Sequence, residues 1–211
     1  MLRTGLILAA LGCAALLTIR VADTVAVEEA PYTVLKRDGD IELRDYAAQL
    51  RAEVVVDTDF DGAGGAAFRT LARYIGGANQ GSRRIAMTAP VVQEAAGTRI
   101  AMTTPVTQER SDAGWAVAFL LPADFTLDSA PEPADPAVTL RRVPPQRMAA
   151  IRYSGRWTRS RYDDALARLR AWLQSQGLEA AGAPVWARHN GPFTPWFLRR
   201  NEVLLPLDAA P

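Results

Sequence analysis

The chain has 211 residues, of which 49% are hydrophobic, and a formal net charge of +1 at pH 7. These values predict a globular domain with a sizeable core, exclude a disordered chain, and give no global attraction for nucleic acid. Cys13 is the only cysteine and His189 the only histidine, which excludes a disulfide framework and a multi-histidine metal site.

The N-terminal segment, residues 1–26, is expected to lie outside the fold. Arg3 precedes an uncharged apolar run over residues 4–19, which is typical of a cleaved export signal. The run is shorter than the roughly 20 residues of a full span, but an uncleaved membrane anchor also fits because Arg20 could reach the interface. Lipidation at Cys13 ranks third, and a buried N-terminal helix is the weakest alternative. The three favoured alternatives place the folded part on the periplasmic side of the membrane, either tethered or released.

The next residues predict a β-hairpin followed by a third strand. Strand-like runs over Tyr32–Arg37 and Ile41–Tyr46 flank Asp38-Gly39, where glycine supplies the positive φ of a tight turn. The β-branched run Leu50–Asp57 is the third strand.

A helix is predicted from Ala66 to Ile75, and Gly76-Gly77 ends it. Its apolar residues recur at helical spacing and are Phe68, Leu71, Ala72 and Ile75. Arg69 and Arg73 lie one turn apart on another face of the same helix.

One phrase then occurs twice. Ile85–Val91 reads IAMTAPV and Ile100–Val106 reads IAMTTPV, fifteen residues further along. Alternate residues of a strand share one face, so each copy is predicted to be a strand, with Met87 or Met102 on the same face as its first isoleucine. The proline of each copy cannot donate a ladder hydrogen bond and should mark an edge or a bulge. The residues between the copies suit a hairpin loop.

The C-terminal half repeats the order of the first half. An apolar strand over Trp115–Pro122 leads into a proline-rich loop, and a later helix is predicted between Thr158 as N-cap and Gly177 as stop. The apolar stripe of this helix is Tyr162, Ala165, Leu166, Leu169, Trp172 and Leu173. Further strands are predicted over residues 138–143, 147–153, 183–190 and 201–207. Strand–helix–strand–strand therefore occurs twice, which predicts a mostly antiparallel α+β domain.

Three stretches together resemble the SOUL family of haem-binding proteins. They are the doubled phrase, VPPQRMAAIRYSGRW at residues 143–157, and PFTPWFLRRNEVLLPL at residues 192–207. The resemblance implies an α+β domain over residues 27–207, with residues 208–211 as a tail. Its two pseudo-symmetric βαββ halves would contribute antiparallel strands to a distorted barrel flanked by two helices. It also implies binding of haem and other porphyrins, and a fold similar to bacterial drug-effector-binding domains.

The resemblance places one wall of the expected tetrapyrrole pocket on the first helix. A tetrapyrrole needs a flat apolar surface and cations for its propionates. Phe68 and Ala72 offer the apolar surface, and Arg69 and Arg73 could bind the propionates. The alternative is an ordinary amphipathic helix whose arginines are solvated.

A strong axial ligand for haem iron is not expected. Met87 and Met102 carry thioethers that could contact or ligate the iron, although methionine more often fills core space. The histidine of some family members lies early in the domain, whereas His189 lies late, so that role is not carried over. His189 is expected on the surface or in loop packing. The predicted haem contacts are therefore apolar groups and arginines, with Met87 and Met102 beside the ligand and no metal-ligand set.

Residues 141–170 hold nine arginines and two acidic residues. This surface could face an anionic membrane, where each basic residue gains roughly 1 kcal/mol. Asp163 and Asp164 lie at helical spacings from Arg168 and Arg170, so part of the charge could instead be a solvated helix face. A monomer that binds no nucleic acid is expected.

Three functions stay open. The favoured one is an exported or membrane-tethered module that binds a tetrapyrrole without reacting with it. The second is a module for another hydrophobic small molecule, in the same cleft without iron. The third is a hydrolase-type enzyme with Glu202 or Tyr153 as acid or base. No catalytic residue is assigned, because the sequence shows no nucleophile with a matched base and because pairing of Glu202 with Arg199 and Arg200 is the simpler expectation.

Overall fold

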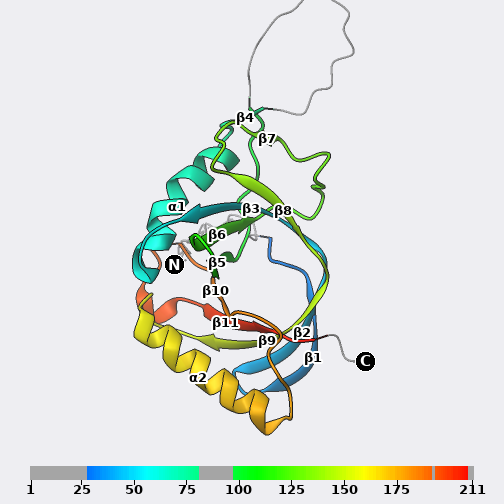
Figure 1. Ribbon diagram of the computed structural model, residues 1–211, viewed down its shortest axis with the longest axis vertical. Helices are drawn as coiled ribbons and strands as arrows, with labels where there is room; N and C mark the ends of the chain where they lie inside the picture. Colours follow the sequence, from blue (N-terminus) through cyan, green and yellow to red (C-terminus); the bar gives the residue numbers. More distant parts are fainter. Residues whose placement is uncertain (1–27, 81–96, 192, 209–211) are drawn as a thin grey trace, which may run out of the picture.

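The computed structural model describes residues 28–80, 97–191 and 193–208. One antiparallel sheet curls into a half-barrel, and two helices lie on its outer face (Figure 1). The strands of this sheet are β1 (Tyr32–Asp38), β2 (Ile41–Tyr46), β3 (Gln49–Val56), β5 (Val106–Ser111), β6 (Gly114–Leu120), β8 (Thr139–Val143), β9 (Gln146–Tyr153), β10 (Val185–Arg188) and β11 (Asn201–Pro206). The other elements are α1 (Phe60–Ile75), α2 (Arg159–Ser175), the short 3-10 helix η1 (Trp196–Leu198), and the two-stranded pair β4 (Asn79–Gln80) and β7 (Glu132–Pro133).

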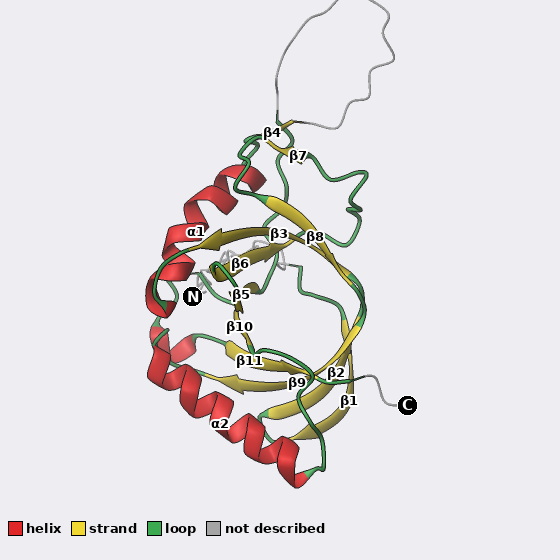
Figure 2. Cartoon of the chain, viewed as in Figure 1, coloured by secondary structure: helices red, strands yellow, loops and turns green. Residues whose placement is uncertain are grey.

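The two halves of the sheet repeat one strand–helix–strand–strand unit (Figure 2). The first unit is β3-α1-β5-β6 and the second is β9-α2-β10-β11. In both units the last strand lies between the other two, because β6 pairs with β3 and β5 while β11 pairs with β9 and β10. β5 and β10 pair with each other at the centre. The predicted α+β fold with two pseudo-symmetric βαββ halves is therefore confirmed.

The predicted N-terminal hairpin is also confirmed. β1 and β2 are antiparallel, and Gly39 in their turn has φ +60°. β2 adds to the second unit through β9, and β8 adds to the first unit through β3. The second βαββ unit is thus extended by the β1–β2 hairpin and the first by the single strand β8.

Helix α1 begins earlier than predicted, at Phe60 instead of Ala66. The first turn is glycine-rich, and glycine is a weak helix former, so the sequence pattern there is poor. The side chain of Asp59 caps this turn by accepting a hydrogen bond from the Gly62 amide at 2.7 Å, and the burial of Phe60 anchors it. The predicted end is confirmed, since Gly76 is the C-cap.

Helix α2 matches its prediction closely. Thr158 is the N-cap and accepts from the Arg161 amide, and Gly177 follows the C-cap with φ +66°. All six residues of the predicted apolar stripe are buried. The helix packs this stripe on β9 and β11 of its own unit.

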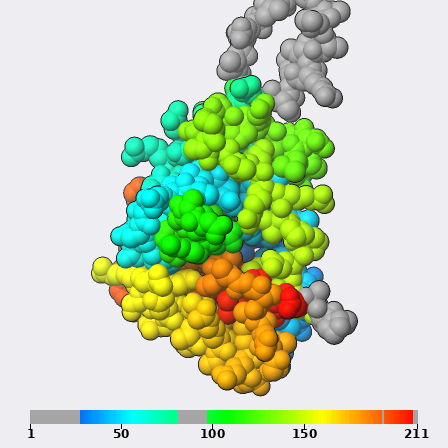
Figure 3. Space-filling view, in the orientation of Figure 1, coloured from blue at the N-terminus to red at the C-terminus, as the bar shows by residue number. Residues whose placement is uncertain are grey.

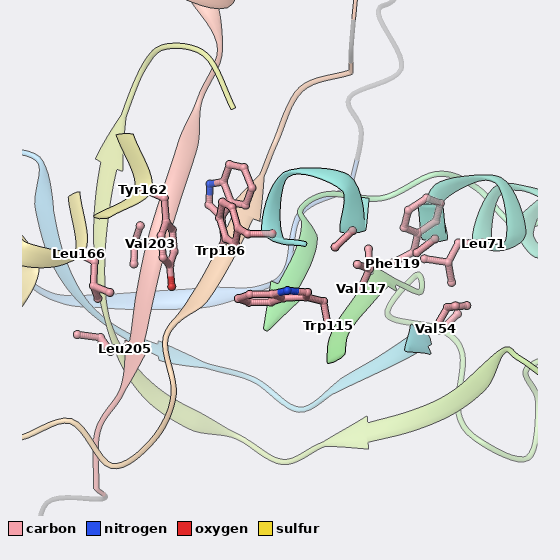
Figure 4. Packing of buried hydrophobic residues seen from close by; sticks show 14 of the residues in the cluster. Val54, Leu71, Trp115, Val117, Phe119, Tyr162, Leu166, Trp186, Val203 and Leu205 are labelled. Carbon is pink, nitrogen blue, oxygen red and sulfur yellow. The ribbon is translucent and has the colours of Figure 1, made fainter. Parts of the chain in front are cut away.

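The main core lies between the helices and the outer face of the sheet (Figure 4). At its centre the ring of Phe60 stacks on Trp186, with centroids 4.6 Å apart, and meets the edge of Trp115 at 5.2 Å. Such aromatic packing adds to the gain from apolar burial. Around these rings lie residues from both units, among them Val54, Leu71, Val117, Phe119, Leu166, Val203 and Leu205.

The strand prediction for the repeated phrase is mostly wrong where the structure can test it. The first copy, with Met87, lies outside the described residues. In the second copy the strand begins only at Val106, directly after Pro105, which cannot donate to a ladder. Met102 is 42% exposed, whereas Thr103 is buried and its hydroxyl donates to the Leu120 carbonyl. The predicted shared face of Ile100 and Met102 is therefore not formed, although the proline does mark a strand end.

Within the described ranges, no helix is both long and apolar enough to span a bilayer. The segment predicted to be an export signal or anchor, residues 1–26, lies outside those ranges.

Candidate functional site

The inner face of the curled sheet carries a second, smaller apolar cluster. Its members are Ala30, Tyr46, Leu120, Met148, Ala150, Val185, Ala187 and Leu204. All of them except Ala150 and Ala187 line an inner cavity of about 30 Å³. The space-filling view shows that side chains fill most of the opening seen in the ribbon (Figure 3). A cavity of this size holds a water molecule at most, so a large ligand cannot sit inside the half-barrel as it stands.

Two larger cavities adjoin one another. The first is about 500 Å³ and the second about 490 Å³. They share the residues Glu28, Pro122, Ala123 and Phe125. The Ala123 amide donates to the Glu28 carboxylate at 2.8 Å, which fixes this shared wall. Each volume lies within the range of about 300–1,000 Å³ that is common for small-molecule sites. We call the two cavities together the groove.

The lining of the groove is mainly apolar. The first cavity is also lined by Pro31, Ala48, Gln49, Leu50, Leu120, Leu121, Thr126, Leu127, Asp128 and Arg142. The second is also lined by Arg99, Ile100, Ala101 and Asp124. Each cavity therefore combines an apolar wall with one arginine and two carboxylates: Arg142 with Glu28 and Asp128 in the first, and Arg99 with Glu28 and Asp124 in the second. The arginines are the groups that could pair with the carboxylates of a flat apolar ligand.

A third arginine lies behind the groove. Gln49 lines both the first cavity and the inner cavity, and its side-chain oxygen accepts from Arg51 Nε at 3.2 Å and Nη2 at 2.9 Å. Arg51 is buried, and burial lowers the pKa of its guanidinium. It makes no ion pair within 4 Å among the described residues, and Gln49 occupies only part of its five N–H donors. Arg51 is thus a buried cation whose closest partner is neutral.

The residues predicted on the first helix do not line the groove. Phe68 is exposed and meets the ring of Phe119 edge-on at 5.5 Å, while Arg69 is exposed and Ala72 is half-buried. Arg73 lines a separate hollow of about 240 Å³ on the far part of α1. A haem contact by these residues stays a prediction, on a surface different from the groove.

The second copy of the repeated phrase does reach the groove. Ile100 and Ala101 line the second cavity, and the Ile100 amide donates to the Ile75 carbonyl at the end of α1. Met102 follows directly and is exposed. A contact between Met102 and a ligand stays a prediction.

A buried charge network lies on the inner face, around Glu202. This carboxylate is 1% exposed and is held by Arg44 through two hydrogen bonds, Nη1–Oε2 at 2.8 Å and Nη2–Oε1 at 3.1 Å. Arg200 Nε donates to Oε1 at 3.0 Å, and His189 Nε2 lies 3.2 Å from Oε2. Arg44 also donates to Glu42 at 2.7 Å. The carboxylate of Glu202 is therefore surrounded by the protein's own cations.

The electrostatics follow from this arrangement. Burial by itself would raise the pKa of Glu202, but His189 and Arg44 outweigh it and hold the pKa well below its usual range. Burial opposes the charge of Arg44, yet Glu202 and Tyr46 raise the pKa of its guanidinium. Glu202 thus stays ionised, and its oxygens are already engaged.

Two sequence expectations need correction here. Of the two alternatives for His189 the surface position is wrong, because its side chain is buried beside Glu202, whereas packing just beyond the end of β10 agrees with the structure. Arg199 does not pair with Glu202; its Nε donates to the Thr194 carbonyl at 2.8 Å and its guanidinium lies over Trp157. Only the pairing with Arg200 is confirmed.

The arrangement offers little for acid–base catalysis. Glu202 is neutralised by neighbouring cations, which makes it a poor base. Burial raises the pKa of Tyr153 above its usual range, which makes it a poor acid or base near neutral pH.

The sequence was compared with models of known protein families. A family model described as SOUL heme-binding protein matches residues 27–206. The chain belongs to the SOUL haem-binding family. This membership indicates a haem-binding protein. No curated protein matches the sequence.

Solved structures similar to this SOUL chain support the fold alone. The C-terminal domain of EcmrR aligns with a TM-score of 0.55 at 12% identity and covers 85% of this chain and 99% of its own. A structure described as a hydrolase from Listeria innocua aligns with a TM-score of 0.52 at 11% identity and covers 82% of this chain and 94% of its own.

Sequence reasoning singled out Glu202 in the SOUL domain but missed its partner Arg44, and it also missed Arg51. Arg44 and Glu202 are 158 positions apart, and only the register of β2, β9 and β11 brings them together. The one available signal was a charged residue inside a strand-like run, as with Arg44 in β2 and Glu202 in β11. Arg51 gave the same weak signal within β3.

Proposed function

We propose that this SOUL chain binds haem or a closely related tetrapyrrole in the groove, through apolar contacts and arginine–carboxylate pairs. The observation that carries the proposal is the pair of adjoining cavities with a shared wall and one arginine each, Arg142 and Arg99. A porphyrin presents a flat apolar ring and two carboxylates, which match these two kinds of lining. Arg51 does not line the groove, but it lies behind the first cavity and is hydrogen-bonded to Gln49 of that lining.

Axial coordination plays a minor part in this proposal. His189 is turned toward Glu202 and lines neither cavity of the groove. Met102 is exposed beside Ala101 and is the described sulfur nearest in sequence to the groove lining. We therefore expect a bound haem without a strong protein ligand, whose affinity depends on ring burial and on carboxylate pairing.

One observation supports the second ligand class, a hydrophobic small molecule other than a tetrapyrrole. The apolar residues that line the groove could also accept another hydrophobic small molecule without iron. A cationic ligand directed at Glu202 is disfavoured, because Arg44 already occupies that carboxylate with a bidentate pair. An enzymatic role has no supporting geometry among the residues that the structure describes.

We also propose that the chain works on the periplasmic side of the membrane, tethered by residues 1–26 or released after their cleavage. The support is the sequence pattern of Arg3 and the apolar run. A general contact of residues 141–170 with anionic lipid is weakened, because four of their nine arginines are in ion pairs: Arg141, Arg147, Arg159 and Arg168. Fractionation of cells that express the full chain tests the location, which fails if the protein stays in the cytoplasmic fraction.

A titration of the full chain with haem, followed by absorbance, tests the ligand. Saturation at one equivalent that survives competition by albumin supports the proposal. Iron-free protoporphyrin should bind with similar affinity if axial coordination is weak. Absence of saturable binding, together with tight binding of an uncharged hydrophobic dye, would instead favour the second ligand class.

A further inference from the structure

The connection between β10 and β11 exposes an apolar surface that the haem groove does not use. Four of its side chains are exposed: Phe193 by 98%, Trp196 by 47%, Phe197 by 58% and Leu198 by 64%. We call residues 193–198 the aromatic loop. Monomeric proteins seldom expose large apolar side chains in such a cluster unless the surface binds something.

The aromatic loop is held in place by its own hydrogen bonds. The Leu198 amide donates to the Pro195 carbonyl at 2.9 Å within η1, and Arg199 Nε donates to the Thr194 carbonyl at 2.8 Å. At its foot the Arg200 amide donates to the Asn190 side chain at 2.6 Å. The rings of Trp196 and Phe197 meet edge-on at 5.5 Å. The loop therefore presents its apolar side chains from a fixed backbone.

Two arginines lie beside this apolar surface. Arg156 lies over the ring of Trp196 at 5.8 Å, and Arg199 lies over Trp157 at 4.0 Å. Arg152 is exposed on the neighbouring strand β9. The nearby carboxylate of Glu29 is paired with Arg200 at 3.0 Å. An apolar centre with a cationic rim is complementary to the acyl chains and the anionic headgroups of a membrane.

The foot of the aromatic loop is also close to where the N-terminal apolar run would enter the fold. Glu29 contacts Arg200, and only the eight residues 20–27 separate the run over residues 4–19 from Glu28. Eight residues extend over at most about 28 Å. A run placed in a bilayer would thus keep the aromatic loop near the same bilayer.

We infer that the aromatic loop enters the interface of an anionic membrane, with Trp196, Phe197 and Leu198 at the level of the acyl chains and Arg156 and Arg199 at the headgroups. The inference rests on the proposed membrane location and adds to it the surface by which the folded domain meets the lipid. It does not depend on haem binding.

Tryptophan quenching by brominated lipid tests this inference with the full chain. Of the five tryptophans, Trp196 is the one that is exposed, and residues 1–26 contain none. Vesicles of phosphatidylglycerol and phosphatidylethanolamine with brominated acyl chains should quench part of the emission. Trp196→Phe should remove most of that quenching, because it keeps an aromatic ring but removes the reporter. Vesicles of phosphatidylcholine alone should quench less.

A double variant, Phe197→Ser with Leu198→Ser, keeps Trp196 as reporter and should lose at least half of the quenching. Leu35→Ser, which changes an exposed leucine on β1, is the matched control and should keep it. Circular dichroism confirms that each variant is folded.

Three other outcomes would overturn the inference. Vesicle association without quenching of Trp196 would leave the membrane location standing and assign it to residues 1–26 alone. Absence of vesicle association would remove the loop contact and the membrane tether, and would leave release after cleavage as the form of the proposed location. Self-association that Phe197→Ser abolishes, without any lipid quenching, would assign the loop to a second copy of the chain.

Discussion

Arg44 and Glu202 form a bidentate ion pair on the inner face of the half-barrel, with both side chains almost fully buried. The pair links β2 to β11 across β9. In this SOUL chain the glutamate at the centre of the fold is therefore satisfied by an internal cation, and a ligand has to be recognised elsewhere.

The first prediction concerns the free energy of unfolding that is lost when Arg44 is removed from this pair. Arg44→Ala should destabilise the domain by about 3–5 kcal/mol, because it leaves Glu202 buried without its main partner. Arg147→Ala is the matched control: its pair with Asp45 is exposed to solvent and should contribute little to stability. Denaturation by urea measures both changes. Equal effects of the two variants would contradict the importance of the buried pair.

The second prediction concerns pH. The pKa of Glu202 is lowered in the folded state, whereas an unfolded glutamate titrates near about 4.3. Glu202 therefore contributes stability above about pH 4.3, and this contribution is lost as the pH falls toward the folded-state pKa. The stability difference between the wild type and Glu202→Gln should shrink as the pH is lowered from 6 to 3. A difference that stays constant over this range would show that Glu202 does not titrate as described.

The third prediction compares two phenylalanines of one helix. Phe60→Ala should cost about 3–5 kcal/mol, because it removes the ring stacked on Trp186 at the centre of the core. Phe68→Ala should cost much less, because that ring is exposed on α1. Thermal unfolding of the two variants checks the order, and a larger loss for Phe68→Ala would contradict the described packing of α1.

Local patterns predicted the elements that depend on local rules. The apolar stripe of α2, its cap at Thr158 and its stop at Gly177 follow helical periodicity and end chemistry, and all were confirmed. The turn at Gly39 was predicted in the same way. The resemblance supplied the pseudo-symmetric arrangement of the sheet, which periodicity alone does not determine.

The errors occurred where distant contacts decide the structure. The second repeated phrase alternates like a strand, but Pro105 delays the ladder to Val106 and the Thr103 side chain bonds to Leu120, which turns Met102 outward. His189 gave no local sign that it packs against Glu202. The groove itself joins segments far apart in the sequence, so its arginines could not be singled out beforehand.

The most direct test of the account is a haem titration that compares two double variants of the full chain. The groove proposal predicts that Arg99→Ala with Arg142→Ala weakens haem binding about tenfold or more, because each carboxylate loses a charge-assisted hydrogen bond. Both side chains are exposed, so the melting temperature should change little. Arg69→Ala with Arg73→Ala should leave the affinity unchanged. Weaker binding in the Arg69 and Arg73 variant, with normal binding in the Arg99 and Arg142 variant, would contradict the groove and place the ligand on α1.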